Sequence, residues 1–360
     1  MKTSTLHESL KRTERVLLIY TGGTIGMGRN EKTGALEPLD FNHLLSRIPE
    51  LEQIQANITV YQFDKPIDSS DMDYLVWSQL VQIISQNYTR YDGFVILHGT
   101  DTMAYTASAL SFMLQNLTKP VILTGSQLPI GQMRTDGKEN LITSIELASL
   151  KNECGVTPIP EVCIYFGGHL LRGNRSTKQD AEQFNAFESF NYPHLCEAGV
   201  EFNFNYHHIL QPDFTRPMIP HKEMNPNILV FSLFPGLQES VFKHIIDNPN
   251  LKGIVMRSYG SGNAPQQKWL TDMLTTAVDR GVVIVNISQC VAGRVEMERY
   301  GAGLHLFNAG VLSGYDSTIE AATTKLMHLS ALHSDPGVIT EHMKRCLAGE
   351  ITLDSCLVKE

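Results

Sequence analysis

The chain has 360 residues, of which 42% are apolar and 19% are charged, and it carries a net charge of −9. This composition allows a sizeable core, excludes a disordered chain and argues against nucleic-acid partners, because an acidic surface repels phosphate. No apolar run approaches the roughly 20 residues of a membrane helix, and the polar segment 1–15 is unlike a signal peptide, so we expect a soluble cytoplasmic protein without membrane contact.

The six cysteines form no CxxC pair and no Cys/His cluster with zinc spacing. They are also too sparse for a disulfide scaffold. The spacing therefore indicates reduced cysteines and predicts no metal site.

Short apolar runs rich in β-branched residues recur along the chain. They are continuous rather than alternating, which is typical of strands covered on both faces. The runs are Val16–Tyr20, Ile58–Phe63, Phe94–Leu97, Val121–Thr124, Val162–Phe166, Ile228–Leu233, Gly253–Met256 and Val282–Ile287.

Segments with helical periodicity lie between these runs. They are Asp71–Gln86, Thr102–Leu117, Asn140–Leu150, Lys268–Asp279 and Ser317–Leu332. Strands that alternate with helices predict an α/β fold with mainly parallel sheets.

A poorly periodic stretch near residues 202–226 contains four prolines and marks a domain boundary. We predict an N-terminal catalytic α/β domain of residues 13–203, a linker of residues 204–226 and a C-terminal α/β domain of residues 227–360.

Polar residues follow several predicted strands, where parallel sheets bind ligands. Thr21-Gly22-Gly23-Thr24-Ile25-Gly26 follows the first strand, and its glycines permit either a tight strand exit or an approach of backbone N–H groups to an oxyanion. In His98-Gly99-Thr100-Asp101-Thr102, Thr100 or Asp101 could cap the next helix, or Asp101 could bind an ammonium group. We interpret His98 as structural.

Lys178 and one more polar segment each have a structural and a functional interpretation. In Asp68-Ser69-Ser70-Asp71-Met72, Ser70 or Asp71 could cap a helix, or the serines could hold a substrate carboxylate at its positive end. Lys178 is either a solvated lysine or, beside a threonine hydroxyl and an aspartate, a general base.

Taken together, these segments resemble the signatures of bacterial-type L-asparaginases. The amino-acid sequences of the loops are similar to those of the cytoplasmic type I branch. Three more segments match the same signatures, and the resemblance extends from about Arg15 to near the C-terminus. These segments are Thr124-Gly125-Ser126-Gln127, Arg172–Lys178 and Arg257–Gly260 with Gly262–Pro265. The resemblance implies a two-domain architecture, with a larger N-terminal domain built on a mainly parallel sheet and a smaller Rossmann-like C-terminal domain.

The resemblance also implies catalytic roles. Thr24 would attack the side-chain amide of L-asparagine and form an acyl-enzyme, and no metal or organic cofactor would be needed. Thr100, Asp101 and Lys178 would form a second catalytic group, in which the lysine draws a proton from a threonine hydroxyl. Which threonine acts in which half-reaction stays open.

Substrate binding follows from the same resemblance. Ser69, with Asp68 and Ser70 alongside, would bind the α-carboxylate, and Asp101 would bind the ammonium group. Thr100 would contact the substrate too, and backbone N–H groups near Gly99 and Ser126 would face the oxyanion.

One position departs from the family pattern. A tyrosine is expected about ten residues after the nucleophile, on a flexible loop, but Ala35 stands there. Tyr300 is either a substitute acid/base or a structural residue. The segment Gly26–Gly34 is expected to be a mobile lid that orders when aspartate binds.

The family resemblance further implies a homotetramer built as a dimer of dimers, and activation by substrate through Thr177, Arg257 and Cys290. Three alternatives remain. They are an asparaginase-like amidotransferase subunit, a dual glutaminase–asparaginase and a non-enzymatic amino-acid sensor. The second is open because one methylene changes specificity by only about 1–3 kcal/mol. The sensor is disfavoured because it need not retain both threonine hydroxyls and the lysine.

Overall fold

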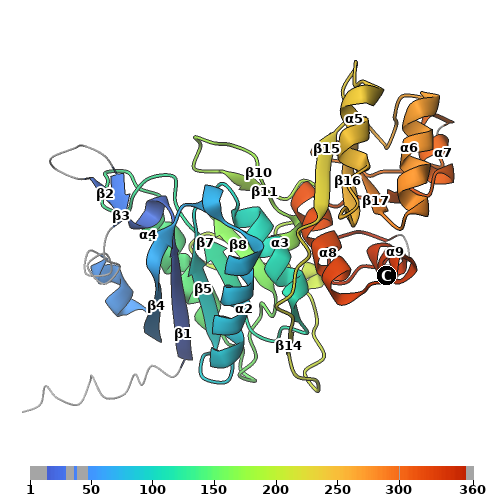
Figure 1. Cartoon of the computed structure of the whole chain (residues 1–360). Helices are drawn as coiled ribbons and strands as arrows, with labels where there is room; N and C mark the ends of the chain where they lie inside the picture. The colour runs from blue at the N-terminus through green and yellow to red at the C-terminus, as the bar shows by residue number, and fades with distance from the viewer. Residues whose placement is uncertain (1–13, 30–35, 39–47, 300, 354–360) are drawn as a thin grey trace, which may run out of the picture. The chain divides into compact units, whose positions relative to one another are not determined.

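A computed structural model describes residues 14–29, 36–38, 48–299 and 301–353 (Figure 1). The chain divides into two compact units. Unit 1 holds most of the chain up to Pro220, and unit 2 holds the rest together with Ser111–Met113 and Phe190–Tyr192.

Unit 1 is built on an eight-stranded sheet in the order β13-β12-β9-β8-β7-β5-β1-β4. The five strands from β8 to β4 run parallel, whereas β8, β9, β12 and β13 pair antiparallel. The strands are β1 (Glu14–Gly22), β4 (Ala56–Ile67), β5 (Gly93–Leu97), β7 (Val121–Thr124), β8 (Val162–Phe166), β9 (His169–Arg172), β12 (Cys196–Ala198) and β13 (Phe202–Phe204).

Helices and short ribbons complete unit 1. The helices are α2 (Tyr74–Asn87), α3 (Met103–Met113) and α4 (Gly137–Ser149), with 3-10 turns η1 (Thr24–Gly26), η2 (Pro49–Gln53), η3 (Ser69–Asp71), η4 (Gly173–Arg175) and η5 (Tyr206–His208). The end of α3, Ser111–Met113, belongs to unit 2. The two-stranded ribbons pair β2 (Met27–Arg29) with β3 (Leu36–Pro38), β6 (Leu114–Gln115) with β14 (Ile219–Pro220), and β10 (Thr177–Lys178) with β11 (Phe187–Glu188).

Unit 2 is a smaller sheet of four parallel strands covered by helices on both faces. The strands are β15 (Ile228–Ser232), β16 (Gly253–Ser258), β17 (Val283–Ser288) and β18 (Leu312–Ser313), in that order. The helices are α5 (Glu239–Ile246), α6 (Lys268–Asp279), α7 (Gly301–Asn308), α8 (Ile319–Leu332) and α9 (Pro336–Met343). Ile254 and Met256 of β16 pack with α5, α6 and α7, whereas Val255 packs with α8 and α9, so successive residues serve opposite faces.

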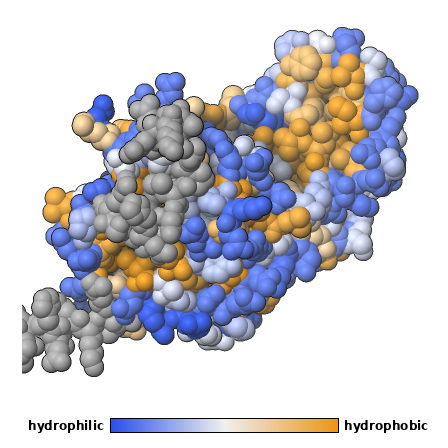
Figure 2. Space-filling model, turned by 60° about the vertical axis from the view of Figure 1, so that its left-hand side comes forward, coloured by the Kyte–Doolittle hydropathy of each residue, from blue (hydrophilic) through white to orange (hydrophobic). Residues whose placement is uncertain are grey.

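An apolar area is visible on the surface of unit 2 in Figure 2. The exposed large apolar residues of this unit include Phe234, Val241 and Ile245, and the apolar residues of the edge strand β15 are only half-buried. An apolar patch of this kind is typical of a contact surface.

The predicted fold class is confirmed, and each predicted strand and helix has a counterpart, but two details were wrong. Residues 58–63 were expected to be covered on both faces, yet they belong to β4, whose burial alternates because it lies at the sheet edge. The helix predicted as Thr102–Leu117 ends at Met113, because Leu114 and Gln115 leave helical geometry and pair with β14. No helix among the described residues is long and apolar enough to cross a membrane.

Candidate active site

Three loops of unit 1 pack together beyond the carboxyl ends of β1, β4 and β5, and glycines make this possible. A Cβ on Gly23, which has a φ of 87°, would lie 2.5 Å from the backbone nitrogen of Gly99. A Cβ on Gly99 would lie 2.6 Å from the Ser69 Oγ. Because such distances are forbidden to a side chain, only glycine lets these loops meet, and their meeting brings the segments of Thr24 and Thr100 to one place.

The two threonines of the first loop have different surroundings. The Thr21 hydroxyl is fully buried and donates to the Leu97 carbonyl at 2.9 Å, which joins the end of β1 to that of β5. Thr24 begins the 3-10 turn η1 and is only partly buried. The position of Thr24 therefore leaves its hydroxyl closer to solvent than that of Thr21.

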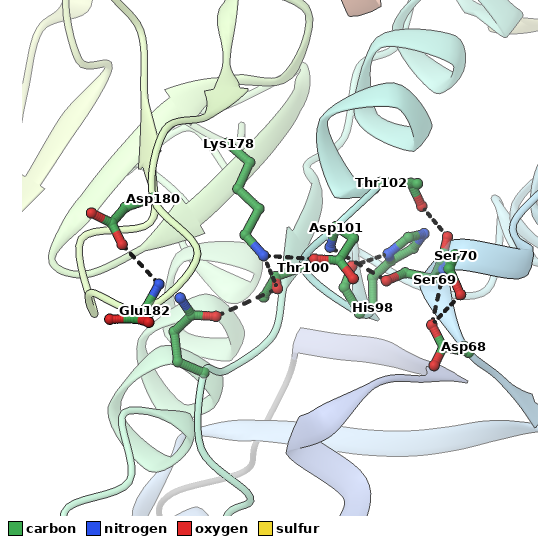
Figure 3. Close-up of polar contacts among 12 residues, drawn as sticks. Asp68, Ser69, Ser70, His98, Thr100, Asp101, Thr102, Lys178, Asp180 and Glu182 are labelled. Atoms are coloured by element: carbon green, nitrogen blue, oxygen red, sulfur yellow. Dashed lines mark hydrogen bonds and ion pairs between the residues drawn. The ribbon is translucent and has the colours of Figure 1, made fainter.

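Lys178 contacts both Thr100 and Asp101 through its Nζ (Figure 3). Its Nζ lies 2.8 Å from the Thr100 Oγ1 and 2.7 Å from the Asp101 Oδ1. Thr100 is 8% exposed, and the side chains of Lys178 and Asp101 are 17% and 65% exposed. The hydroxyl is thus enclosed, while the carboxylate remains open to a ligand.

Neither Thr100 nor Asp101 caps helix α3, so the capping interpretation of these residues was wrong. The N-cap of α3 is Thr102, which makes no side-chain capping bond and instead donates to the Ser69 carbonyl at 2.6 Å. The Thr100 hydroxyl donates to the Gln127 Oε1 over a long 3.5 Å. Sequence reasoning missed Gln127, although it ends the third strand-end segment.

The serine segment is organised around its aspartate. The Asp68 carboxylate accepts bonds from the Ser70 N–H and hydroxyl, both at 2.9 Å, and the backbone bond contributes most to lowering the pKa of Asp68. Asp68 therefore caps η3, and Asp73 caps α2 through the Leu75 and Val76 N–H groups. The expected caps, Ser70 and Asp71, were wrong, because aspartates just before each turn reach the free N–H groups first.

Ser69 is buried between the same loops. Its Oγ accepts the Asp101 backbone N–H at 3.3 Å, and the residue is 4% exposed. Since the oxygen acts as acceptor in this contact, the hydroxyl proton is available to a ligand.

His98 lies beneath the site and is fully buried. Its Nδ1 lies 2.6 Å from the Gly99 carbonyl, and its Nε2 lies 2.8 Å from the Thr106 Oγ1, which also accepts the Trp77 Nε1–H. Burial lowers the pKa of His98 to about 4. A neutral imidazole with both nitrogens engaged fits the structural interpretation.

Ser126 is also buried, and its hydroxyl donates to the Leu128 carbonyl at 2.6 Å. The neighbouring Gln127 and Leu128 N–H groups donate to the Asp136 carboxylate. Side-chain and backbone hydrogen bonds therefore both hold this turn in place.

The remaining predicted residues are dispersed. Thr177 precedes Lys178 on β10 in unit 1. In unit 2, the Arg257 Nη2 donates to the Gln289 carbonyl at 3.4 Å, next to the exposed Cys290. Tyr300 and Ala35 lie outside the described residues, as does most of the expected lid. Among the described residues, side chains suited to a metal come together at His169, His194 and Glu197, elsewhere in unit 1.

Comparison with known proteins gives a consistent result over both units. The family model "Asparaginase, N-terminal" matches residues 15–210, and "Glutaminase/Asparaginase C-terminal domain" matches residues 227–343. The chain is 42% identical to L-asparaginase 1 of Escherichia coli K12, over 94% of this chain and 98% of that protein.

Two solved structures are also similar. The crystal structure of L-asparaginase I from Vibrio cholerae is 38% identical, with a TM-score of 0.85 over 94% of this chain and 99% of that one. The thermostable L-asparaginase from Thermococcus kodakarensis is 32% identical, with a TM-score of 0.85 over 94% of this chain and 100% of that one.

Proposed function

The chain belongs to the asparaginase family of amidohydrolases, and on that premise we propose that it hydrolyses L-asparagine to L-aspartate and ammonia through a threonine nucleophile. The observation that carries the mechanism is the position of Lys178, whose Nζ contacts both the Thr100 hydroxyl and the Asp101 carboxylate. A threonine hydroxyl is a weak nucleophile until a neighbouring base takes its proton, and this arrangement supplies an amine at hydrogen-bond distance from the Thr100 hydroxyl.

In the proposed first half-reaction, the Thr24 oxygen attacks the amide carbon of the substrate side chain. The hydroxyl proton passes to the leaving nitrogen, ammonia departs, and an ester joins the substrate to the protein. In the second half-reaction, water attacks this ester and restores the threonine. Backbone N–H groups of the glycine-rich loops are suited to stabilise the oxyanion in both steps, and one such donor contributes about 10²–10³ in rate.

Lys178 can accept a proton only as a neutral amine, because an ammonium group has donors but no acceptor. Asp101 orients the amine, and its exposed face is free to bind the substrate ammonium group. The amine is therefore suited to accept a proton during the reaction only when it is neutral.

Ser69 is the proposed anchor of the α-carboxylate. Its oxygen already accepts the Asp101 N–H, so its proton can be donated to the carboxylate of a substrate. The substrate would thus present its ammonium and carboxylate groups to adjacent residues, which fixes the direction of its amide.

The decisive experiment is ammonia release from asparagine and from glutamine over a wide concentration range, for the parent, Thr24→Ala and Thr100→Val. We expect both variants to fold and to lose at least about 10²-fold in kcat. Full activity in folded Thr24→Ala would remove Thr24 as nucleophile, and a parent that binds asparagine without releasing ammonia would be a sensor.

An amidotransferase subunit and a dual glutaminase–asparaginase are the other candidate functions. The 42% identity to E. coli L-asparaginase 1 favours an asparaginase. Ammonia release in the absence of tRNA would distinguish an asparaginase from an amidotransferase subunit. The ratio of kcat/KM for asparagine and glutamine would distinguish an asparaginase from a dual enzyme.

We further infer a cytoplasmic homotetramer that is activated by substrate, with Thr177, Arg257 and Cys290 near the second site and Tyr300 as a substitute acid/base. Unit 2 has an apolar area on its surface (Figure 2). This area, together with exposed apolar residues such as Phe234, supports self-association. Light scattering tests the assembly, a sigmoidal rate curve tests activation, and Tyr300→Phe with normal turnover would exclude the last role.

A further inference from the structure

Two histidines and a glutamate converge at the antiparallel edge of the unit 1 sheet. His169 begins β9, and Glu197 lies directly opposite it on β12. His194 precedes β12, and its ring centroid lies 4.4 Å from that of His169. One ligand atom from each of the three side chains lies within 4.8 Å of the others.

Each histidine of the cluster has a ring nitrogen that can bind a metal ion. The His194 Nε2 lies 2.8 Å from the Glu188 Oε1, and with a proton on Nε2 the lone pair of His194 is on Nδ1. The Nδ1 of His169 is shielded from solvent and has no hydrogen-bond partner among the described residues. A buried nitrogen without a partner is unfavourable, so a ligand at this position would stabilise the fold.

We propose that His169, His194 and Glu197 form a binding site for a divalent transition-metal ion, with zinc as the best match. Two imidazole nitrogens and one carboxylate oxygen are a zinc ligand set, whereas magnesium and calcium take oxygen ligands. Glu188 would orient His194 through the other ring nitrogen, as a carboxylate does behind many metal-bound histidines.

The geometry requires only small movements. Ligand atoms of a tetrahedral zinc site lie about 3.3 Å apart, since each bond is about 2.0–2.1 Å long. The three side chains are all partly or fully exposed and can rotate to reach this spacing. His169 lies far from the other two residues in sequence, which is why motif spacing alone predicted no metal site.

Bound zinc would also restrict the movement of the β10–β11 ribbon, which carries Lys178. Glu188 is on β11 opposite Thr177 of β10, one residue before Lys178. Zinc at His194 would hold this carboxylate in place, so the site is expected to stabilise the ribbon rather than take part in the chemistry.

The test is calorimetric titration of zinc into the full chain after treatment with a chelator. We expect one ion per chain and a zinc-dependent rise in the thermal unfolding midpoint. His169→Gln, His194→Gln and Glu197→Gln should each weaken binding by about 10-fold or more. The exposed Glu197 offers a variant that will fold even if a histidine variant does not.

A matched control is the His333→Gln/His342→Gln double variant. These two rings also stack, with centroids 5.0 Å apart, but the described residues place no third ligand beside them. This variant should bind zinc like the parent. Absence of binding by the parent at millimolar zinc, or unchanged binding by Glu197→Gln and His169→Gln, would overturn the proposal, whatever the result of the ammonia assay.

Discussion

Two lysine–carboxylate pairs, one in each unit, have almost the same geometry and very different surroundings. The Lys178 Nζ lies 2.7 Å from Asp101 in unit 1, and the Lys325 Nζ lies 2.6 Å from Glu350 in unit 2. The side chains of the first pair are 17% and 65% exposed, whereas those of the second are 2% and 1% exposed. Distance therefore does not distinguish the two pairs, and burial does.

The other partners of each lysine explain the difference. The Lys325 Nζ also donates to the Met343 and Arg345 carbonyls, and Glu350 accepts backbone N–H groups of Leu347 and Ala348. This pair closes the segment after α9 against α8. The second hydrogen bond of Lys178 is to the Thr100 hydroxyl group, which can react. A satisfied buried pair maintains the fold, whereas an accessible pair next to a hydroxyl is suited to chemistry.

The largest expected effect is on the activity of Lys178→Met. The variant keeps the stem of the side chain and removes the amine, so we expect a fall in kcat of about 10²–10⁴. The free energy of unfolding should change by less than about 1 kcal/mol, because the pair is open to solvent on the Asp101 side. Ammonia release and urea unfolding measure the two quantities.

Lys268→Met is the matched control for this variant. Lys268 pairs with Asp272 at 2.6 Å, but the two side chains are 86% and 57% exposed on α6. Its kcat should equal that of the parent, and its free energy of unfolding should change by no more than about 0.5 kcal/mol. Lys178→Met with parental kcat would end the proposed role of its amine.

The next effect is on the stability of Lys325→Met. Loss of one partner leaves the Glu350 charge buried, and we expect the free energy of unfolding to fall by about 3–5 kcal/mol. The remaining folded enzyme should keep its kcat. Urea unfolding followed by circular dichroism measures the loss.

The double variant Lys325→Met/Glu350→Gln sharpens this result. The amide can still accept the Leu347 or Ala348 N–H while the uncompensated charge is gone, so part of the lost stability should return. Equal stability of the single and double variants would show that the lost bonds to the Met343 and Arg345 carbonyls, or lost packing, cause the effect rather than the buried charge.

The strands and the strand-end loops were readable from the sequence because buried parallel strands are continuous apolar runs. The same reasoning predicted a common position for the threonine loops, and the structure places Gly23 against Gly99. The roles of Thr24 and Lys178 remain predictions that require activity measurements.

Other features had no local signal. Strands β9, β12 and β13 have only three or four residues, too few to show a period, and they pair through tertiary contacts. The Gln127 contact with Thr100 depends on how two loops meet. Short helices such as α9 lack enough turns for a periodic pattern, although Asp335 caps it and Pro336 begins it.

Each unit also contains a buried histidine, and both predict sensitivity to acid. Burial lowers the pKa of His98 and of His328 to about 4, below the value near 6.5 of an unfolded chain. The unfolded state therefore binds protons first as the pH falls. Stability should be full above pH 6.5 and decrease between about 6.5 and 4, by up to about 3 kcal/mol for each histidine.

Urea unfolding at a series of pH values measures this loss. In His98→Gln the contribution of His98 disappears, so the slope of stability against pH should be smaller than that of the parent in the same interval. Carboxylates such as Asp68 contribute to both proteins and cancel in the difference. Parallel pH profiles would show that His98 does not remain neutral in the folded chain.

The smallest effect separates the two histidines by their hydrogen bonds. His98 has a partner for each nitrogen, so His98→Leu leaves the Gly99 carbonyl and the Thr106 hydroxyl with one bond fewer and should cost about 1–3 kcal/mol at neutral pH. His328 has no hydrogen-bond partner for either nitrogen among the described residues and stacks on Phe112.

His328→Leu therefore removes two unsatisfied nitrogens and keeps an apolar side chain of similar size, so its effect should lie between zero and a gain of about 1 kcal/mol. Urea unfolding at pH 7.5 measures the free energy of unfolding of both leucine variants. We expect it to be lower than that of the parent in His98→Leu but not in His328→Leu. If both variants lose the same stability, His328 has a partner such as a buried water, and the two units treat their buried histidines alike.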